Sequence, residues 1–184
     1  MSVLTLDATY PEQRNRLTVF FRTLIAIPHF IVAGVWGWWV EILSLAQWFI
    51  IVFTGKRNQG IYDMQRAWLD YNARVVTYVA LLHDVFPPFG TDAGTVPIRV
   101  DMAYEEAGNR LTTALRILWA IPAIIIMAVI GIGAYFVIAI SWLVILFTGK
   151  QPQGMWSFAH KMLQMSLRVQ AYTLLMTDTY PSYS

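Results

Sequence analysis

The sequence predicts an all-α integral membrane protein built from two tandem copies of one helical unit. Three observations lead to this fold class: an apolar composition, two long runs almost without charge, and an internal repeat. The chain of 184 residues is 57% hydrophobic and 13% charged, whereas soluble domains are about 45–50% apolar and about 25% charged. Too few polar residues remain to cover a soluble core of this composition, so we expect the chain in a membrane.

Two long runs hold most of the apolar residues. Between Thr23 and Lys56 the only formal charge is Glu41, and between Ile117 and Phe147 there is none. Apolar runs of 18 or more residues with few charges indicate membrane-embedded helices. The N-terminal residues lack the pattern of a cleaved signal peptide, so the first run is expected to remain in the protein.

An offset of 94 residues aligns the second half of the chain with the first half without a gap. It places the string FTGK at 53–56 on the same string at 147–150, and about one third of the paired positions are identical. Such a repeat predicts two copies of one structural unit. The units are residues 1–90 and 97–184, with a Pro/Gly-rich linker at 85–96.

Each apolar run is predicted to form a helical hairpin, at 17–54 in the first unit and at 111–148 in the second. As one helix the first run would be about 55 Å long, against a hydrocarbon core of about 30 Å. We therefore expect a turn near Gly37 and another near Gly131, which gives four embedded helices. Spanning hairpins are favoured, and re-entrant hairpins that stop inside the bilayer are the alternative.

An amphipathic helix is predicted after each hairpin, at 60–83 and 154–177, where apolar residues follow a 3-4-3-4 spacing. These two helices are expected to lie along the cytoplasmic interface of the membrane. Short strands are predicted at 3–6 and 97–100. Because these segments occupy equivalent positions in the two units, we expect them to pair near a pseudo-twofold axis.

Basic residues predict the orientation in the membrane. Arg14 and Arg16 precede the first run and Lys56 follows it, and the second run is flanked in the same way. Because basic residues near membrane ends stay in the cytoplasm, both ends of each hairpin and both termini are expected there. Each FTGK string is expected to end a helix, with glycine in the left-handed conformation and lysine reaching the headgroups.

The residues of the first unit resemble a known family. The matching residues are Tyr10-Pro11-Glu12, Arg16-Leu17-Thr18, Phe21-Arg22, Ala26-Ile27-Pro28-His29, Phe53-Thr54-Gly55-Lys56, Gly60, Arg74, Tyr78, Asp84 and Pro87-Pro88-Phe89. They resemble DUF4389, a domain of unknown function from uncharacterised bacterial membrane proteins. The second unit departs from this pattern at Glu105, at Ala123 and in its last residues. The resemblance implies a multi-pass protein of the bacterial inner (cytoplasmic) membrane and supplies no activity.

Charged residues shared by the two units are the candidate site residues, either for structural pairing or for binding lipid headgroups. They are Arg16, Arg22, Lys56, Arg74, Asp84, Arg110, Arg116, Lys150, Arg168 and Asp178. We expect an arginine at the base of each hairpin to pair with the aspartate that ends the following helix. Headgroup binding by the arginines is the alternative.

Three residues inside the apolar runs are further candidates. Glu41 is the candidate intramembrane acid, either functional or solvated at the far surface. Pro28 and Pro122 are expected to kink their helices, because proline removes a backbone hydrogen bond.

The sequence favours a non-catalytic protein without a cofactor. The chain has no cysteine, its three histidines share no ligand spacing, and a net charge of +2 is too small to predict nucleic-acid binding. The leading hypothesis is an accessory or scaffold subunit that packs against a membrane-protein partner in a larger complex, or that forms a homo-oligomer, among membrane lipids. A component of a small-solute or lipid transporter or channel that uses the repeat interface is one alternative. A membrane-shaping hairpin protein is the other.

Overall fold

The computed structural model describes residues 4–182, which form five helices and two strands. Each half of the described chain contains a strand, a long apolar helix and a second helix, in the order that the repeat predicts. The elements are β1 (Thr5–Ala8), α1 (Arg16–Thr54), α2 (Gln59–Val79), β2 (Ile98–Asp101), α3 (Arg110–Ala114), α4 (Arg116–Thr148) and α5 (Gln153–Thr173).

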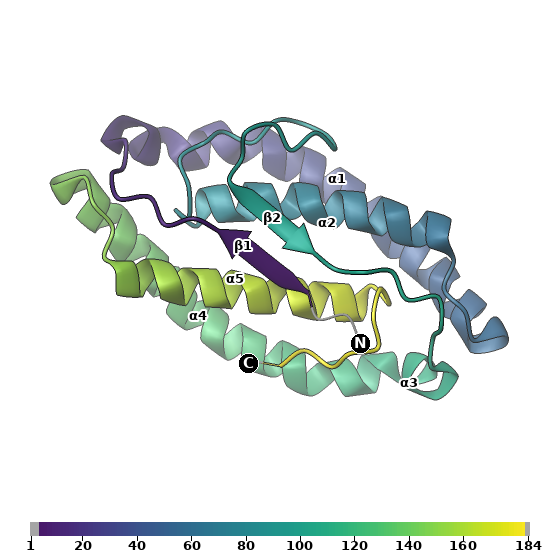
Figure 1. The fold of residues 1–184 in the computed structure, drawn as a ribbon. Coiled ribbons are helices and arrows are strands. Elements are labelled where there is room, and N and C mark those ends of the chain that lie inside the picture. Colours follow the sequence, from purple (N-terminus) through teal and green to yellow (C-terminus); the bar gives the residue numbers. More distant parts are fainter. Residues whose placement is uncertain (1–3, 183–184) are drawn as a thin grey trace.

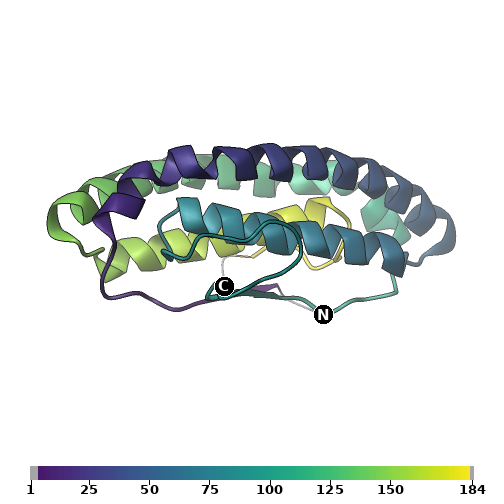
Figure 2. The ribbon, with the colours of Figure 1, turned by 90° about the horizontal axis from the view of Figure 1, so that it is seen from above.

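The elements are stacked in three layers (Figures 1 and 2). The long helices α1 and α4 form the first layer and run in opposite directions. The helices α2 and α5 form the second layer, α2 packed along α1 and α5 packed along α4. The two strands and the loops around them form the third layer.

Each apolar run forms a single helix, so the predicted hairpins at 17–54 and 111–148 are wrong. α1 continues through Gly37 and α4 continues through Gly131 without a turn. Glycine inside a helix costs only about 1 kcal/mol, and neither segment contains the polar residues that usually form a turn. The described chain therefore has two long apolar helices where the sequence predicts four embedded ones.

Gly37 has a packing role in place of the predicted turn. A Cβ atom at this position would lie 3.2 Å from the indole of Trp68 on α2. The same indole donates a hydrogen bond of 2.9 Å to the carbonyl oxygen of Ala33. This glycine allows α2 to approach α1 closely, which supports a straight helix at this point.

The two strands pair as the repeat predicts. β1 and β2 are antiparallel, and Leu6 lies opposite Val100, which is its equivalent in the second unit. Relative to the structure, the predicted strand at 3–6 begins two residues early and the predicted strand at 97–100 begins one residue early. Val3 lies outside the described residues. The pseudo-twofold axis therefore passes through the centre of this short sheet.

Equivalent contacts at the two ends of the first layer follow the same axis. The indole of Trp48 donates to the carbonyl oxygen of Thr113, and that of Trp142 donates to the carbonyl oxygen of Val19, both at 3.0 Å. Each bond joins α1 to the helical segment of the other unit. The axis therefore passes through all three layers, and rotation about it superposes each end of the molecule on the other.

The helices predicted at 60–83 and 154–177 are present, and each ends about four residues earlier than predicted. Neither helix lies only on the surface of the protein, because both contribute to its core. Leu69 of α2 and Leu167 of α5 are fully buried in the main core, together with Leu6 and Val100 of the strands. The strand layer covers the side that the sequence pattern left to solvent.

Candidate membrane-binding face and charged clusters

The two FTGK strings end the long helices in the predicted conformation. Gly55 has a φ of 74° and Gly149 a φ of 72°, the left-handed region that glycine adopts at little cost. Each turn also contacts the other unit. The backbone N–H of Gly108 donates to the Gly55 carbonyl at 2.9 Å, and that of Arg14 donates to the Gly149 carbonyl at 3.0 Å. The end of each long helix is therefore held against the segment that precedes the other one.

Lys56 contacts a protein carboxylate where the sequence predicts a lipid headgroup. Its Nζ lies 2.8 Å from Oε1 of Glu106, and both side chains are exposed. The hydrogen bond and the opposite charge raise the pKa of Lys56 and lower that of Glu106. Such an exposed pair contributes little to stability, so its main effect is to neutralise Lys56.

The first charged cluster, called the Asp84 cluster, consists of Arg14, Arg22, Asp84 and Gln151. Arg22 forms an ion pair with Asp84, as the sequence predicts, and Nη1 of Arg14 lies 3.0 Å from the same carboxylate. Arg22 also donates to the carbonyl oxygen of Tyr78 at 2.7 Å. Both guanidinium groups are buried, so the single carboxylate of Asp84 stands between two positive charges removed from water.

The second cluster, called the Asp178 cluster, consists of Arg57, Arg116 and Asp178. Asp178 pairs with Arg57 at 2.8 Å and with Arg116 at 2.6 Å, and it accepts a backbone hydrogen bond from Asn109 at 2.9 Å. Burial acts to raise the pKa of Asp178, but the hydrogen bonds from Asn109 and Arg57 and the two arginine charges outweigh it. The pKa of Asp178 is therefore below its ordinary value.

The two clusters obtain their second arginine from different places. Arg14 in the Asp84 cluster corresponds by the repeat to Gly108, and Arg57 in the Asp178 cluster corresponds to Gln151. Nη2 of Arg14 donates to Oε1 of Gln151 at 2.6 Å, so the two exchanged positions are in contact. Sequence reasoning missed Arg14 and Arg57 because only residues shared by both units were selected.

This exchange predicts that the arginine arrangement of the Asp178 cluster can be built at the Asp84 cluster. Arg14→Gly removes hydrogen bonds to a charged group, and we expect a loss of about 1.5–3 kcal/mol of unfolding free energy. Adding Gln151→Arg should restore at least about 1 kcal/mol, because the new arginine supplies the missing charge from the position that Arg57 uses. The measurement is thermal or chemical unfolding in mild detergent.

Gln151→Arg alone is the control for this conversion, and we expect it to destabilise the protein because it places three arginines around one carboxylate. A double variant that is no more stable than Arg14→Gly would contradict the exchange.

Arg74 and Arg168 hold loops. Arg74 bonds to the carbonyl oxygens of Gly90 and Asp92 in the linker, the first at 2.7 Å. Arg168 bonds to the carbonyl oxygens of Leu4 and Ser182, at 2.9 Å and 2.8 Å. Since these bonds are made to the protein backbone, both arginines have a structural role in the structure described.

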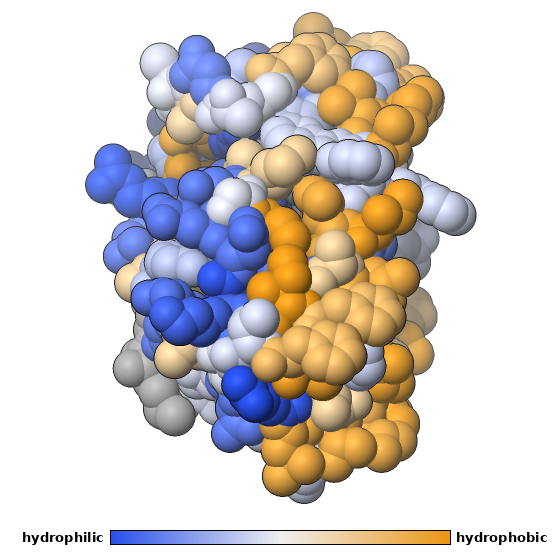
Figure 3. Space-filling view, turned by 90° about the vertical axis from the view of Figure 1, so that its right-hand side faces the viewer, coloured by the Kyte–Doolittle hydropathy of each residue, from blue (hydrophilic) through white to orange (hydrophobic). Residues whose placement is uncertain are grey.

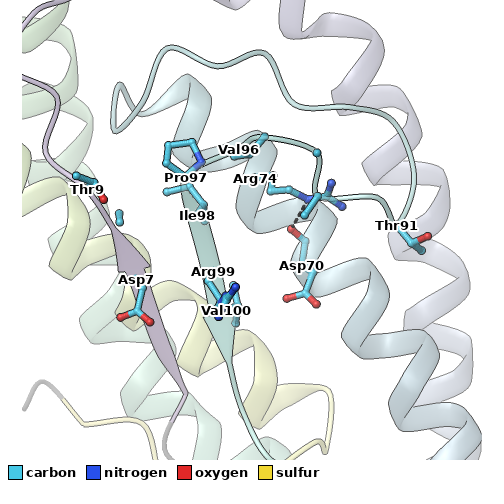
Figure 4. Close-up of a pocket in the computed structure, with 13 residues that line it drawn as sticks. Asp7, Thr9, Asp70, Arg74, Thr91, Val96, Pro97, Ile98, Arg99 and Val100 are labelled. Atoms are coloured by element: carbon cyan, nitrogen blue, oxygen red, sulfur yellow. Dashed lines mark hydrogen bonds between the residues drawn. The ribbon is translucent and has the colours of Figure 1, made fainter.

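A polar pocket of about 540 Å³ lies between the strands, α2 and the linker (Figure 4). Arg74 stands at its inner wall and bonds to the backbone of Asp70, while Asp7 and Arg99 project from the two strands. The charges at the pocket are balanced in sign. Among residues 4–182, no group of three or more His, Cys, Asp or Glu side chains could hold a metal ion.

The candidates inside the apolar runs lie within the long helices. α1 contains Pro28 and α4 contains Pro122, and each helix continues past its proline. Glu41 lies on the side of α1 that faces α2, where it lines a shallow pocket with Trp68 and Asn72. It is exposed, which fits a solvated acid at the edge of the first layer.

One face of the molecule is apolar and the opposite face is charged (Figure 3). The apolar face is formed by α1, α3 and α4, whose outward side chains are large and exposed. Among the most exposed are Leu17, Val35, Trp38, Phe53, Leu111, Ile117, Val129, Ile132 and Phe147, whose exposed fractions range from 64% to 81%. An apolar surface of this extent marks an interaction with a membrane or with another protein.

The fold and this face define a helix-rich protein of two repeated units, with two helices long and apolar enough to cross a membrane. The family model for a domain of unknown function (DUF4389) matches residues 16–90 and again residues 110–184. The chain therefore belongs to the DUF4389 family and carries two tandem copies of its domain. No curated protein and no solved structure matches it.

Proposed function

We propose that this protein is a non-catalytic protein of the bacterial cytoplasmic membrane that lies flat in one leaflet. In this arrangement α1 and α4 face the lipid chains, and the strand layer faces the cytoplasm as a platform for a membrane-protein partner. The observation that supports it is the division of the surface into one apolar face and one charged face (Figure 3). A flat protein with one apolar face and one charged face is stable at an interface between lipid and water.

Helix length favours the flat arrangement over a crossing one. α1 has 39 residues, which corresponds to about 58 Å, and a hydrocarbon core is about 30 Å thick. A crossing helix of this length would need a tilt well outside the usual range of about 0–40°. In the plane of the leaflet, the length of the helix is not limited by the thickness of the bilayer.

Charge supports the same arrangement. The exposed residues Asp7, Arg99 and Asp101 lie on the central sheet, halfway between the ends of the long helices. A crossing orientation would bring them to the middle of the bilayer, where each charge costs at least about 2.5 kcal/mol. Lys56 follows the C-terminal end of α1 and Lys150 follows that of α4, and these two helix ends lie at opposite ends of the molecule (Figure 1). A crossing orientation would therefore place the two lysines on opposite sides of the membrane, against the preference of basic residues for the cytoplasm.

Cysteine labelling tests this proposal directly, because the chain has no native cysteine. Single cysteines at positions 56, 101 and 150 should react with a membrane-impermeant maleimide only from the cytoplasmic side. A cysteine in place of Val129, on the apolar face, should react from neither side until detergent is added. Labelling of position 56 or 150 from the outside would rule out the flat arrangement.

Membrane shaping is a second candidate function, favoured by the size of the apolar face. Two helices of 39 and 33 residues in one leaflet would expand that leaflet alone and bend the membrane. Electron microscopy of vesicles before and after addition of the protein tests this, and vesicles of unchanged shape would count against it.

A further inference from the structure

An apolar groove of about 700 Å³ lies between the two repeat units. Its walls are α1 and α4, and its floor is formed by α2 and α5. Phe30 and Tyr135 line the groove and are also exposed on the apolar face, so the groove opens on that face. At its inner end the groove is lined by Arg22 and by Trp142, whose indole joins α4 to α1. Its size and apolar lining are those of a site for a small hydrophobic ligand.

The groove depends on small residues that the repeat does not preserve. Ala80 and Ala139 line it, and their equivalents in the other half are Leu174 and Leu45. Leu174 is 2% exposed and packs in the main core, so the larger side chain occupies the equivalent space. Leu45, in contrast, is 60% exposed, so Leu174 alone shows how a larger side chain fills this space.

The groove lies near the more basic end of the molecule. The guanidinium of Arg16 lies against Gly149, with Nε 3.2 Å from the position of a Cβ there, and Lys150 follows directly. Within residues 4–182, neither Arg16 nor Lys150 forms an ion pair, and both are exposed. At the opposite end Lys56 is neutralised by Glu106. Arg16 and Arg22 are six residues apart, about 9 Å along the helix, so the basic end adjoins the groove.

We infer that this groove holds one acyl chain of an anionic phospholipid, whose phosphate binds between Arg16 and Lys150. This inference rests on the proposed membrane placement, because the groove opens toward the lipid chains only if the apolar face is in the leaflet. The groove supplies the apolar part of the site, and the two unpaired cations supply charge complementary to the phosphate. The neutralised lysine and the large leucine at the other end explain why one such site is expected in the molecule.

Native mass spectrometry of the full chain in mild detergent tests the site, with phosphatidylglycerol and phosphatidylcholine added together. We expect one bound phosphatidylglycerol on the unmodified protein. Ala80→Leu combined with Ala139→Leu should abolish this adduct. Arg16→Gln and Lys150→Gln should each weaken the preference for phosphatidylglycerol by about fivefold.

Two variants serve as matched controls. Ala128→Leu adds the bulk of one such leucine on the exposed side of α4, at a residue that does not line the groove, and Arg110→Gln removes the equivalent of Arg16 at the opposite end. Both should bind lipid as the unmodified protein does. Retained phosphatidylglycerol on the filled-groove variant, or its displacement by oleate at equal concentration, would overturn the assignment.

Flotation with liposomes separates this inference from the proposed function. The filled-groove variant should still float, because its apolar face is intact. If the unmodified protein does not float, the membrane placement fails; if both proteins float and both retain the lipid, only the groove assignment fails.

Discussion

Replacing Asp84 with asparagine is expected to cost about 3–5 kcal/mol of unfolding free energy. The carboxylate of Asp84 is the ion-pair partner of both Arg14 and Arg22, and the guanidinium groups of both arginines are buried. An amide leaves two positive charges out of water without a counter-charge, and this penalty is much larger than the loss of one hydrogen bond. Unfolding in mild detergent, followed by circular dichroism, measures the change.

Two further variants define the origin of this effect. Asp63→Asn makes the same chemical change at an exposed position of α2 and should alter stability by less than about 0.5 kcal/mol. Asp178→Asn should cost about as much as Asp84→Asn, because Arg57 and Arg116 stand in the same relation to it. A loss below about 1 kcal/mol for both cluster variants would show that water reaches these arginines.

The repeat allowed several features of the fold to be predicted from the sequence. It placed the two units, the paired strands on the axis, the left-handed glycines and the pairs of Arg22 with Asp84 and Arg116 with Asp178. The strands and the glycine turns contact the other half, whereas each arginine–aspartate pair lies within one half, and both kinds of contact recur because the two halves have the same fold. Residues at equivalent positions are therefore informative even without related sequences.

The error in the long helices came from the assumption that each apolar run crosses a membrane perpendicular to its plane. A run of 37 residues exceeds one perpendicular crossing, and the glycine at position 37 was the nearest residue able to form a turn. The structure uses that glycine to admit Trp68 from α2. A helix alone does not reveal which neighbour approaches it, so a close-packing glycine and a turn glycine look alike in the sequence.

The unshared arginines of the charged clusters could have been found by a different comparison. Arg14 stands opposite Gly108, and Arg57 stands opposite Gln151, so each unit has gained an arginine where the other has lost one. This compensating pattern is a sign of spatial contact. The groove, in contrast, depends on how four helices meet, and no local pattern predicts it.

The second large effect is expected from acid, through the buried histidine His83. Its side chain is 2% exposed, and one ring nitrogen lies 3.2 Å from the hydroxyl of Thr77. Burial lowers the pKa of His83 to about 4, and the positive charges of Arg22 and Arg14 act in the same direction, against backbone hydrogen bonds that favour the charged ring. The neighbouring carboxylate of Asp84 is already paired with both arginines.

The sign of the pH effect follows from where the proton binds. In the unfolded chain His83 takes up a proton near pH 6.5, whereas in the folded protein it does so only near pH 4. Between these values the unfolded state binds the extra proton, so stability falls by roughly 3 kcal/mol in total as the pH is lowered. Above pH 6.5 the ring is neutral in both states and contributes nothing to the pH dependence.

Comparison with His83→Gln isolates this contribution, because the amide does not titrate and other groups affect both proteins equally. The unfolding free energies of the two proteins, measured from pH 8 to pH 4, should keep a constant difference above pH 6.5. Below it, the unmodified protein should lose roughly 3 kcal/mol more than the variant. Parallel curves over the whole range would show that His83 takes up its proton at the same pH in the folded protein as in the unfolded chain, and the loop that joins α2 to the linker would then have to admit water around the ring.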